Sequence, residues 1–371
     1  MALRFSSLEG LEVNSNFWRN KRVLITGHTG FKGSWLSLWL QSWGAEITGY
    51  ALPPSSNPSL FHAANVGEGM TSIYGDIRDQ LKLQEIFSRY QPEIIIHMAA
   101  QPLVRQSYRE PVETYSTNVM GVVNLLEAVR QTGCVKSVVN VTSDKCYENR
   151  EWVWGYREDE AMGGFDPYSS SKGCSELITA AYRNSYFNPS EYHMHGVAIG
   201  SARAGNVIGG GDWSDERLIP DILRAFVAGK PAEIRNPHAI RPWQHVLEPL
   251  TGYLRLAQTL YEKGPAFGGG WNFGPSENDA RSVGWVMDGM IREWGGGASW
   301  KAADGHHPHE ANYLKLDSSK SKALLQWGPT WSLQEALKMV CIWHKAYLSQ
   351  ADMRELTLKQ IETFNDFRKM R

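Results

Sequence analysis

The sequence predicts an α/β protein built on a doubly wound, mainly parallel sheet that carries a smaller, interleaved substrate domain. Short β-branched runs alternate with longer helical patterns from Val23 onward, which is typical of βαβ units. The segment Ile94-Ile95-Ile96 is continuously apolar, as expected of a strand covered by helices on both faces of a sheet. A glycine-rich segment directly follows the first predicted strand, where folds of this class bind nucleotides.

The predicted elements follow one another in a regular order up to residue 205. We expect strands at 23–26, 46–50, 72–75, 94–97, 137–142 and 196–202, and helices at 32–43, 80–90, 112–132 and 168–184. After Asn206 the rhythm breaks, although 241–247 and 271–274 resemble strands that would extend the first sheet. We therefore assign 1–205 and 237–275 to a dinucleotide-binding domain, and 206–236 and 276–371 to a substrate domain. The basic stretch 355–371 is predicted as a solvated amphipathic helix.

Composition excludes several classes of protein. The 371 residues include 38 Lys plus Arg and 39 Asp plus Glu, a net charge of -1, which argues against a partner such as duplex nucleic acid or an anionic membrane. The apolar runs are too short for a transmembrane helix. Four dispersed cysteines suggest neither a disulfide framework nor a zinc site and fit a reducing cytoplasm. The segment His306-His307-Pro308-His309 has poor ligand spacing, so we expect no metal.

The glycine-rich segment is Thr26-Gly27-His28-Thr29-Gly30-Phe31-Lys32-Gly33. Glycines at these positions allow a sharp turn and let the N–H groups of a helix N-terminus approach a pyrophosphate. Because a strand precedes this segment and a helical pattern follows it, we predict a dinucleotide site.

The cofactor's second anchor is less clear. An acidic residue at the end of the second strand commonly binds the adenosine ribose, but residues 50–57 contain neither an acid nor an arginine. His28 and Lys32 would compensate by lying against the phosphates, although Lys32 is equally well explained as a solvated lysine of the first helical turn. Asp76 would either bind the adenine amino group or cap the following helix.

A second motif, Tyr168 with Lys172, lies at the start of a predicted helix. Residues four apart share one helix face. The lysine ammonium and a bound nicotinamide cation would favour the phenolate of Tyr168 and so lower its pKa. We therefore consider Tyr168 a candidate base.

At this point the sequence resembles the extended short-chain dehydrogenase/reductase family, from Lys21 to near its end. The resemblance rests on the glycine motif, on His97-Met98-Ala99-Ala100-Gln101, on Asn118 and on Tyr168 with Lys172. It implies NAD as cofactor, acid/base catalysis by Tyr168, ribose binding by Lys172, and a homodimer formed through helices 112–132 and 168–184. The implied cofactor-binding residues are Gly27, His28, Thr29, Gly30, Phe31, Lys32, Gly33, Asp76, Ile77, Ala99, Ala100, Gln101, Asn118, Tyr168 and Lys172.

The end of the fifth strand is similar to that of the nucleotide-sugar 4,6-dehydratases. Ser143-Asp144-Lys145 stands where those enzymes have Thr-Asp-Glu. The resemblance implies that Ser143 holds the sugar 4-hydroxyl, that Asp144 protonates the leaving 6-hydroxyl, and that Lys145 takes the C5 proton. Because Lys replaces Glu, Lys145 would alternatively pair with Asp144 or stabilise an enolate. Lysine in this place, with the form of the glycine motif, points to CDP-glucose among the nucleotide sugars.

The nucleotide half of the substrate is expected at two other segments. Residues 203–206 and 240–243 resemble the family's diphosphate-contacting regions, with Asn206 and Arg241 as best candidates. Arg217 and Tyr313 are further candidates, or equally a surface salt bridge and a core aromatic.

The implied reaction is redox-neutral dehydration for dideoxysugar and surface polysaccharide biosynthesis, catalysed by a cytoplasmic lyase. Three alternatives remain open. One is a 4,6-dehydratase that acts on another nucleotide sugar. The others are a nucleotide-sugar 4-epimerase, which needs no acid/base pair after the fifth strand, and a non-catalytic protein that senses NAD.

Overall fold

A computed structural model describes residues 14–303 and 313–370. Its main sheet has seven strands in the order β10-β6-β5-β4-β1-β2-β3, and all neighbouring pairs are parallel. This sheet confirms the predicted fold class and all six strands expected before residue 205. The strands are β1 (Arg22–Thr26), β2 (Glu46–Ala51), β3 (Thr71–Tyr74), β4 (Ile94–His97), β5 (Ser137–Val141), β6 (Ala198–Ala204) and β10 (Gly269–Phe273).

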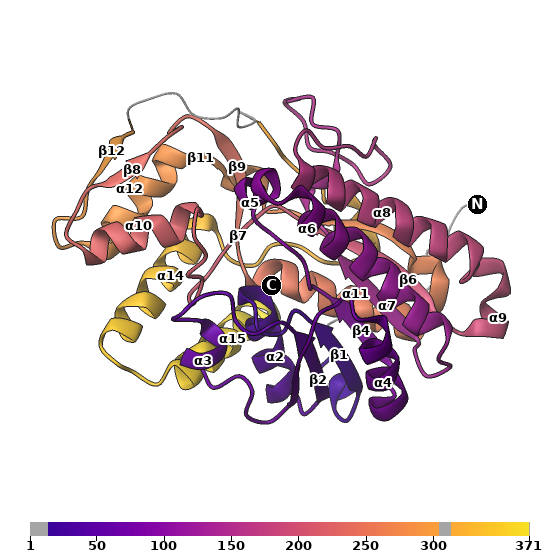
Figure 1. Ribbon diagram of the computed structural model, residues 1–371. Coiled ribbons are helices and arrows are strands. Elements are labelled where there is room, and N and C mark those ends of the chain that lie inside the picture. The colour runs from indigo at the N-terminus through magenta and orange to yellow at the C-terminus, as the bar shows by residue number, and fades with distance from the viewer. Residues whose placement is uncertain (1–13, 304–312, 371) are drawn as a thin grey trace.

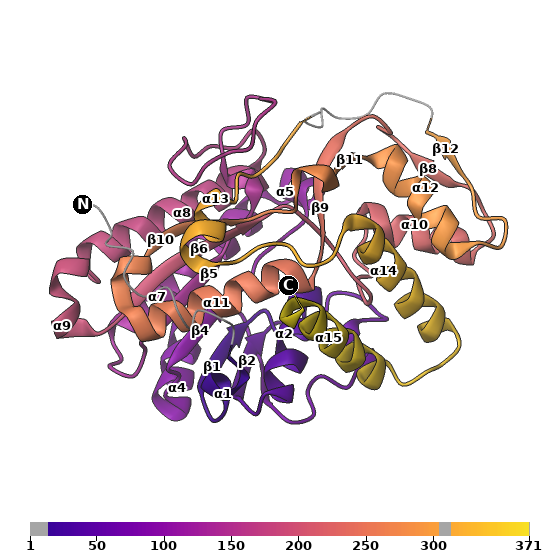
Figure 2. The ribbon, with the colours of Figure 1, turned by 180° about the vertical axis from the view of Figure 1, so that it is seen from behind.

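Helices cover both faces of the sheet (Figures 1 and 2). One face packs on α2 (Phe31–Ser42) and α11 (Leu247–Lys263), and their apolar side chains share one core with β1 and β5. The other face packs on α4 (Gln80–Tyr90), α7 (Gly121–Arg130) and α8 (Pro167–Ser185) through a second core. Shorter helices are α1 (Ser15–Trp18), α3 (Leu60–Ala63) and α9 (Tyr192–His195).

The helix predicted at 112–132 is interrupted. The chain forms α5 (Val104–Arg109), α6 (Pro111–Tyr115), a π-helical turn (Ser116–Met120) and then α7. A π-helical turn holds one residue more than an α-helical turn, so it changes the direction of the side chains around it. Here it buries the amide of Asn118, which bonds to the backbone after β4.

A smaller assembly lies at the opposite end of the molecule from α4 and α7 (Figure 1). It contains a sheet of β11 (Ala280–Ser282), β9 (Ile240–His245) and β7 (Asn206–Ile208), and a parallel pair, β8 (Ala232–Ile234) with β12 (Trp300–Ala302). The helices α10 (Leu218–Val227), α12 (Val283–Trp294) and α14 (Leu333–Leu348) enclose a separate core.

The expectation that both later strands extend the first sheet was half right. Trp271 lies in β10, which pairs with β6 as predicted. Residues 241–247 do not join that sheet, because β9 pairs instead with β7. The chain leaves the main sheet at Gly205, where a Cβ atom would lie 2.5 Å from Cγ of Pro242, so glycine permits this close approach.

The C-terminal elements return to the main sheet. Helix α13 (Ser319–Leu325) lies beside β10, and α15 (Met353–Lys369) packs on α2. Phe364 of α15 is buried against Trp39 and Trp331. The predicted amphipathic helix therefore exists, but its apolar face belongs to the large core rather than to solvent. No helix within 14–303 or 313–370 is long and apolar enough to cross a membrane.

Candidate active site

The glycine loop folds tightly against the end of β4. Gly27 has φ 77°, and a Cβ atom there would lie 2.8 Å from the backbone nitrogen of Ala99. A Cβ atom on Gly33 would lie 2.1 Å from the carbonyl oxygen of Gly27. Gly30 precedes α2 without a side-chain capping bond. The loop thus leaves the positive N-terminal end of α2 for an anionic group and fits the pyrophosphate of a dinucleotide.

His28 does not extend from this loop toward α2. Its ring fills the space that Gly49 leaves open, and its Nε2 lies 2.7 Å from Oγ of Ser72. Burial lowers the pKa of His28 to about 4, so the ring is neutral near pH 7. Thr29 donates a hydrogen bond to the carbonyl oxygen of Leu52. His28 thus ties the loop to β3, and Thr29 ties it to the residue after β2. The expected phosphate contact of His28 stays a prediction.

Asp76 does not cap α4, which corrects one of the two interpretations of this residue. The capping side chain is Asp79, whose Oδ1 accepts from Lys82 N at 2.9 Å. The carboxylate of Asp76 instead binds Arg78, which lowers the pKa of Asp76. Ile77, next in the chain, is buried. Adenine binding by Asp76 and Ile77 stays a prediction.

Lys32 is not a solvated lysine. Its Nζ lies 6.0 Å from the ring centre of Tyr253 in α11. Burial, together with the positive charges of Arg217 and Lys172, lowers the pKa of Lys32 to about 7. The first turn of α2 therefore carries an amine into the same space as the Tyr168 and Lys172 motif.

Replacing Lys32 by methionine is expected to stabilise the chain in a pH-dependent way. The pKa of Lys32 is about 7 when folded, against about 10.4 for an unfolded lysine. Between these two pH values the unfolded chain binds more protons than the folded chain. Burial of Lys32 therefore lowers the free energy of unfolding by its full amount below about pH 7, and this loss disappears near pH 10.4. We expect Lys32→Met to gain about 1–3 kcal/mol at pH 6 and little at pH 10.

Urea unfolding at both pH values measures this gain. The matched control is Lys82→Met, because Lys82 forms an ion pair with Glu85 on the exposed side of α4. An equal change for both variants at pH 6 would refute the assignment of Lys32 to a buried site.

The turn after β5 holds Ser143, Asp144 and Lys145. Ser143 Oγ lies 2.9 Å from Asp144 Oδ1 and also bonds with Tyr168. Asp144 is buried, and its Oδ2 has no hydrogen-bond partner among the residues described. Burial raises the pKa of Asp144, which is the direction that a general acid needs. When protonated, a carboxyl with an unpartnered oxygen can donate a proton to a bound ligand.

Tyr168 and Lys172 lie on the first turns of α8, as predicted. Asp166 caps this helix by accepting from Ser169 N at 2.9 Å. Lys172 Nζ donates to the carbonyl oxygen of Val141 at 3.3 Å, and burial lowers the pKa of Lys172 to about 8.

The expected depression of the Tyr168 pKa does not occur in the chain alone. Burial raises the pKa of Tyr168 to about 12. Removal of the phenolate from water destabilises it more than Ser143 and Arg217 stabilise it. Any shift toward the phenolate must therefore come from bound cofactor or substrate.

The backbone after β4 is fixed by side chains from neighbouring elements. Asn118 Oδ1 accepts from Gln101 N at 2.8 Å, and its amide donates to Ser171 Oγ. Thr26 Oγ1 accepts from Ala99 N. The segment that includes Ala99, Ala100 and Gln101 is therefore held between the glycine loop and α8.

Two of the four residues predicted for substrate binding lie close to the turn after β5. Arg217 forms an ion pair with Asp212, Nη1 to Oδ2 3.1 Å, and its charge lowers the pKa of Lys32. The charge of Arg241 in β9 opposes, but does not outweigh, the rise that burial causes in the pKa of the nearby Asp144. Arg217 is thus a salt-bridged residue, as one interpretation had it, but one that lies near Lys32 and Tyr168.

The other two lie nearby on the smaller assembly. Asn206 is the first residue of β7, opposite Trp243. Tyr313 bridges to Ile240, next to Arg241, so it is not a core aromatic. Sequence analysis missed Asp212 and Tyr253; the position of Asp212 directly after the glycines 209–211 was an available signal.

Metal ligands do not gather in the part of the chain that the structure covers. No group of three His, Cys, Asp or Glu within 14–303 and 313–370 could hold a metal ion. The segment His306-His307-Pro308-His309 lies outside the described residues. All four cysteines are free thiols.

Comparison with known proteins defines the class first. Residues 24–340 match the family described as GDP-mannose 4,6 dehydratase, and the chain belongs to this family of nucleotide-sugar enzymes with the extended short-chain dehydrogenase/reductase fold. Within it, a CDP-glucose 4,6-dehydratase of Salmonella typhimurium is 57% identical over 352 residues, which cover 95% of this chain and 98% of that protein.

Solved structures share the fold at lower sequence identity. A dTDP-glucose 4,6-dehydratase of Bacillus anthracis in complex with NAD has a TM-score of 0.72 at 22% identity, covering 89% of this chain and 98% of that one. A UDP-glucose 4-epimerase of Thermotoga maritima with UDP-glucose has a TM-score of 0.75 at 23% identity, covering 88% and 99%.

Proposed function

We propose that this protein is an NAD-dependent lyase that converts CDP-glucose to CDP-4-keto-6-deoxyglucose. The observation that carries the proposal is Asp144, a buried acid beside Ser143 and Tyr168, one of whose oxygens has no hydrogen-bond partner among the residues described. A 4-epimerase has no use for a proton donor at this place. The preference for CDP-glucose rests on the 57% identical relative.

The proposed cofactor site runs from the glycine loop to Lys172. The N-terminal turn of α2 would hold the pyrophosphate, and Lys172 would bind the nicotinamide ribose. When bound, NAD would supply the acceptor for a hydride from the sugar C4 and the donor for its return to C6. The N-cap of α2 is Gly30, so no side chain competes with a ligand for the N–H groups of its first turn.

The chain's own groups would divide the acid/base work. Tyr168 would take the proton of the 4-hydroxyl while Ser143 orients that hydroxyl. The resulting ketone acidifies C5, where Lys145 would remove a proton as Asp144 protonates the departing 6-hydroxyl. The nucleotide diphosphate would be held by Arg217, Arg241, Asn206 and Tyr313. Guanidinium groups can form paired hydrogen bonds with a phosphate.

Mass spectrometry in deuterium oxide tests the function. The protein is incubated with catalytic NAD and separately with CDP-, dTDP-, UDP- and GDP-glucose. We expect the product to have lost one water and gained one deuterium at C5, with CDP-glucose as the best substrate. A product of unchanged mass with inverted C4 would establish an epimerase instead, and NAD binding without any product would favour a sensor.

We also propose a homodimer. Apolar side chains are exposed along α6, the π-helical turn that follows it and α8, including Val112 at 80% and Leu177 at 60%. Exposed apolar side chains on adjacent helices are typical of a protein interface. Roles in dideoxysugar and surface polysaccharide biosynthesis, and a cytoplasmic location, stay predictions.

Leu177→Glu is expected to convert the dimer to a monomer, because a carboxylate at a two-fold interface is buried twice. Sedimentation equilibrium measures the mass. The matched control is Leu81→Glu, since Leu81 is also exposed, at 78% against 60% for Leu177, but lies on α4. A monomeric mass for the unaltered chain, or a dimer that survives Leu177→Glu, would contradict the proposed interface.

A further inference from the structure

We infer that the buried ion pair between Glu176 and Arg203 positions the turn after β5, residues 143–146, by holding both of its ends. We call these four residues the catalytic turn. The inference rests on the proposed function and concerns how Asp144 and Lys145 are placed for loss of water. The pair acts through hydrogen bonds with the two residues that flank the turn, one between Glu176 and Thr142 and one between Arg203 and Tyr147.

The pair joins a strand of the main sheet to a helix that covers one face of it. Glu176 lies on α8, one turn beyond Lys172, and Arg203 lies on β6. Arg203 Nε and Nη2 donate to the two carboxylate oxygens of Glu176 at 2.8 and 3.0 Å. Their side chains are 4% and 5% exposed. Although burial opposes ionisation, the charge of Arg203 and its hydrogen bonds lower the pKa of Glu176, so both groups stay charged.

One half of the pair holds the start of the turn. Thr142 Oγ1 donates to Glu176 Oε1 at 2.5 Å. Thr142 is the last residue before Ser143, so this bond fixes the direction in which the chain leaves β5.

The other half holds the end of the turn. Arg203 Nη1 donates to the hydroxyl oxygen of Tyr147 at 2.7 Å, and that hydroxyl donates to Asn272 Oδ1 at 2.7 Å. The guanidinium also lies 5.0 Å from the ring centre of Tyr147. Four residues, 143–146, thus lie between two side chains attached to one rigid pair.

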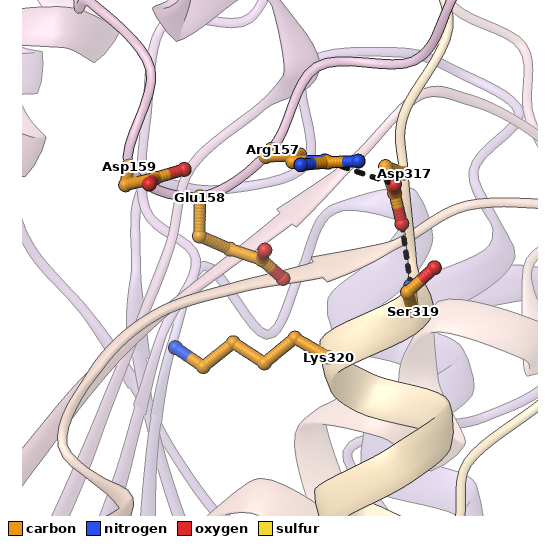
Figure 3. Close-up of a pocket in the computed structure, with 6 residues that line it drawn as sticks. All are labelled: Arg157, Glu158, Asp159, Asp317, Ser319 and Lys320. Carbon is orange, nitrogen blue, oxygen red and sulfur yellow. Dashed lines mark hydrogen bonds and ion pairs between the residues drawn. The ribbon is translucent and has the colours of Figure 1, made fainter.

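The surroundings show that space is kept for this pair. A Cβ atom on Gly270 would lie 2.3 Å from Arg203 Nη2, so glycine in β10 makes room for the guanidinium. On its outer side, Arg203 donates to the carbonyl oxygen of Glu158, whose carboxylate accepts from Asn272 N. A cavity of about 350 Å³ lies beyond Glu158, and Glu158 and Lys320 both reach into it (Figure 3).

Stability alone is a weak explanation for the pair. Burying two charges costs about as much as their attraction returns, and apolar replacements of buried pairs are often as stable. A charged pair does, however, offer directed hydrogen bonds that an apolar pair lacks. Here those bonds go to the two residues that enclose Asp144 and Lys145.

Thr142→Val and Tyr147→Phe test the inference because they remove one hydroxyl each and leave the ion pair in place. We expect each to lower kcat with CDP-glucose about 10- to 100-fold, since small displacements of reacting groups cost this much, with KM within about twofold. The matched control is Tyr156→Phe. Tyr156 stacks on Tyr147, but its hydroxyl bonds to Asn149 and Arg150 outside the turn.

Two readouts separate positioning from a loss of folded protein. In stopped flow, the near-ultraviolet absorbance of reduced nicotinamide is expected to build up in Thr142→Val and Tyr147→Phe, because oxidation at C4 proceeds while loss of water is slow. The Tyr156→Phe control should match the unaltered protein. Urea unfolding of all variants accounts for differences in stability.

A third readout does not depend on the substrate. Hydrogen exchange of the amides of 143–146 is expected to quicken about tenfold or more in Tyr147→Phe and not in Tyr156→Phe. Equal exchange in Tyr147→Phe and Tyr156→Phe would overturn the inference. A loss of kcat in Thr142→Val and Tyr147→Phe without accumulation of reduced cofactor would also overturn it. If the unaltered protein turns over no CDP-glucose, the proposed function fails, and the exchange result still decides whether the pair holds the turn.

Discussion

Replacing Asp144 by asparagine is expected to lower kcat for dehydration about 10²- to 10⁴-fold, the usual contribution of a general acid. Asparagine keeps the shape of the side chain and can still accept the bond from Ser143. It cannot supply the proton that the leaving 6-hydroxyl needs. Because burial disfavours the charged form and raises the pKa of Asp144, the variant should fold at least as well.

Product formation from CDP-glucose, followed by mass spectrometry, measures this loss. Asp79→Asn is the control, since Asp79 caps α4 on the far side of the sheet from α2 and α11. Its kcat should remain within about twofold. An Asp144→Asn variant with unimpaired turnover would contradict the dehydratase and favour the 4-epimerase.

Replacing Gly33 by alanine is expected to destabilise the chain by about 3 kcal/mol or more. Its Cβ atom would lie 2.1 Å from the carbonyl oxygen of Gly27. Backbone atoms on both sides cannot move without displacing the start of α2 from β1, and overpacking of this kind is costly. The displaced loop should also lose its affinity for NAD.

Gly30→Ala is the matched control within the same loop. Its Cβ atom would meet only the carbonyl oxygen of Gly27, at 3.4 Å, and Gly30 has φ -77°, which alanine adopts freely. We expect a change in unfolding free energy within about 1 kcal/mol. Urea unfolding of both variants decides the matter, and equal losses would contradict the tight packing of Gly33.

Much of the fold could be predicted from local pattern. The runs at Val23 and at Ile94 are buried parallel strands because their apolar side chains face helices on both sides. Local pattern does not name a strand's partner, however. Residues 240–245 have the composition of a strand in either sheet, and only the turn at Gly205 brings them to β7.

The sequence predicts those parts of the candidate site that follow from the order of parallel strands and helices. Ser143 and Tyr168 meet because β5 ends beside the start of α8. Burial raises the pKa of Tyr168 in the chain itself, which a four-residue spacing does not reveal. The predicted shift toward the phenolate with bound nicotinamide stays a prediction. The pair Glu176–Arg203 was missed for a related reason: its members are 27 residues apart and meet only once β6 is in place.

The path of the chain between the two cores has a consequence for motion. The chain leaves the main sheet after β6, returns as α11 and β10, and leaves again through β11 and α12. It returns in α13 beside β10, leaves once more as α14, and ends in α15 against α2. Among the described residues, several connections therefore join the two cores. A hinge between them would have to bend these connections at once, so we expect the two cores to melt in one cooperative transition. We likewise expect ligands to enter by local movement of surface loops rather than by rotation of one core against the other.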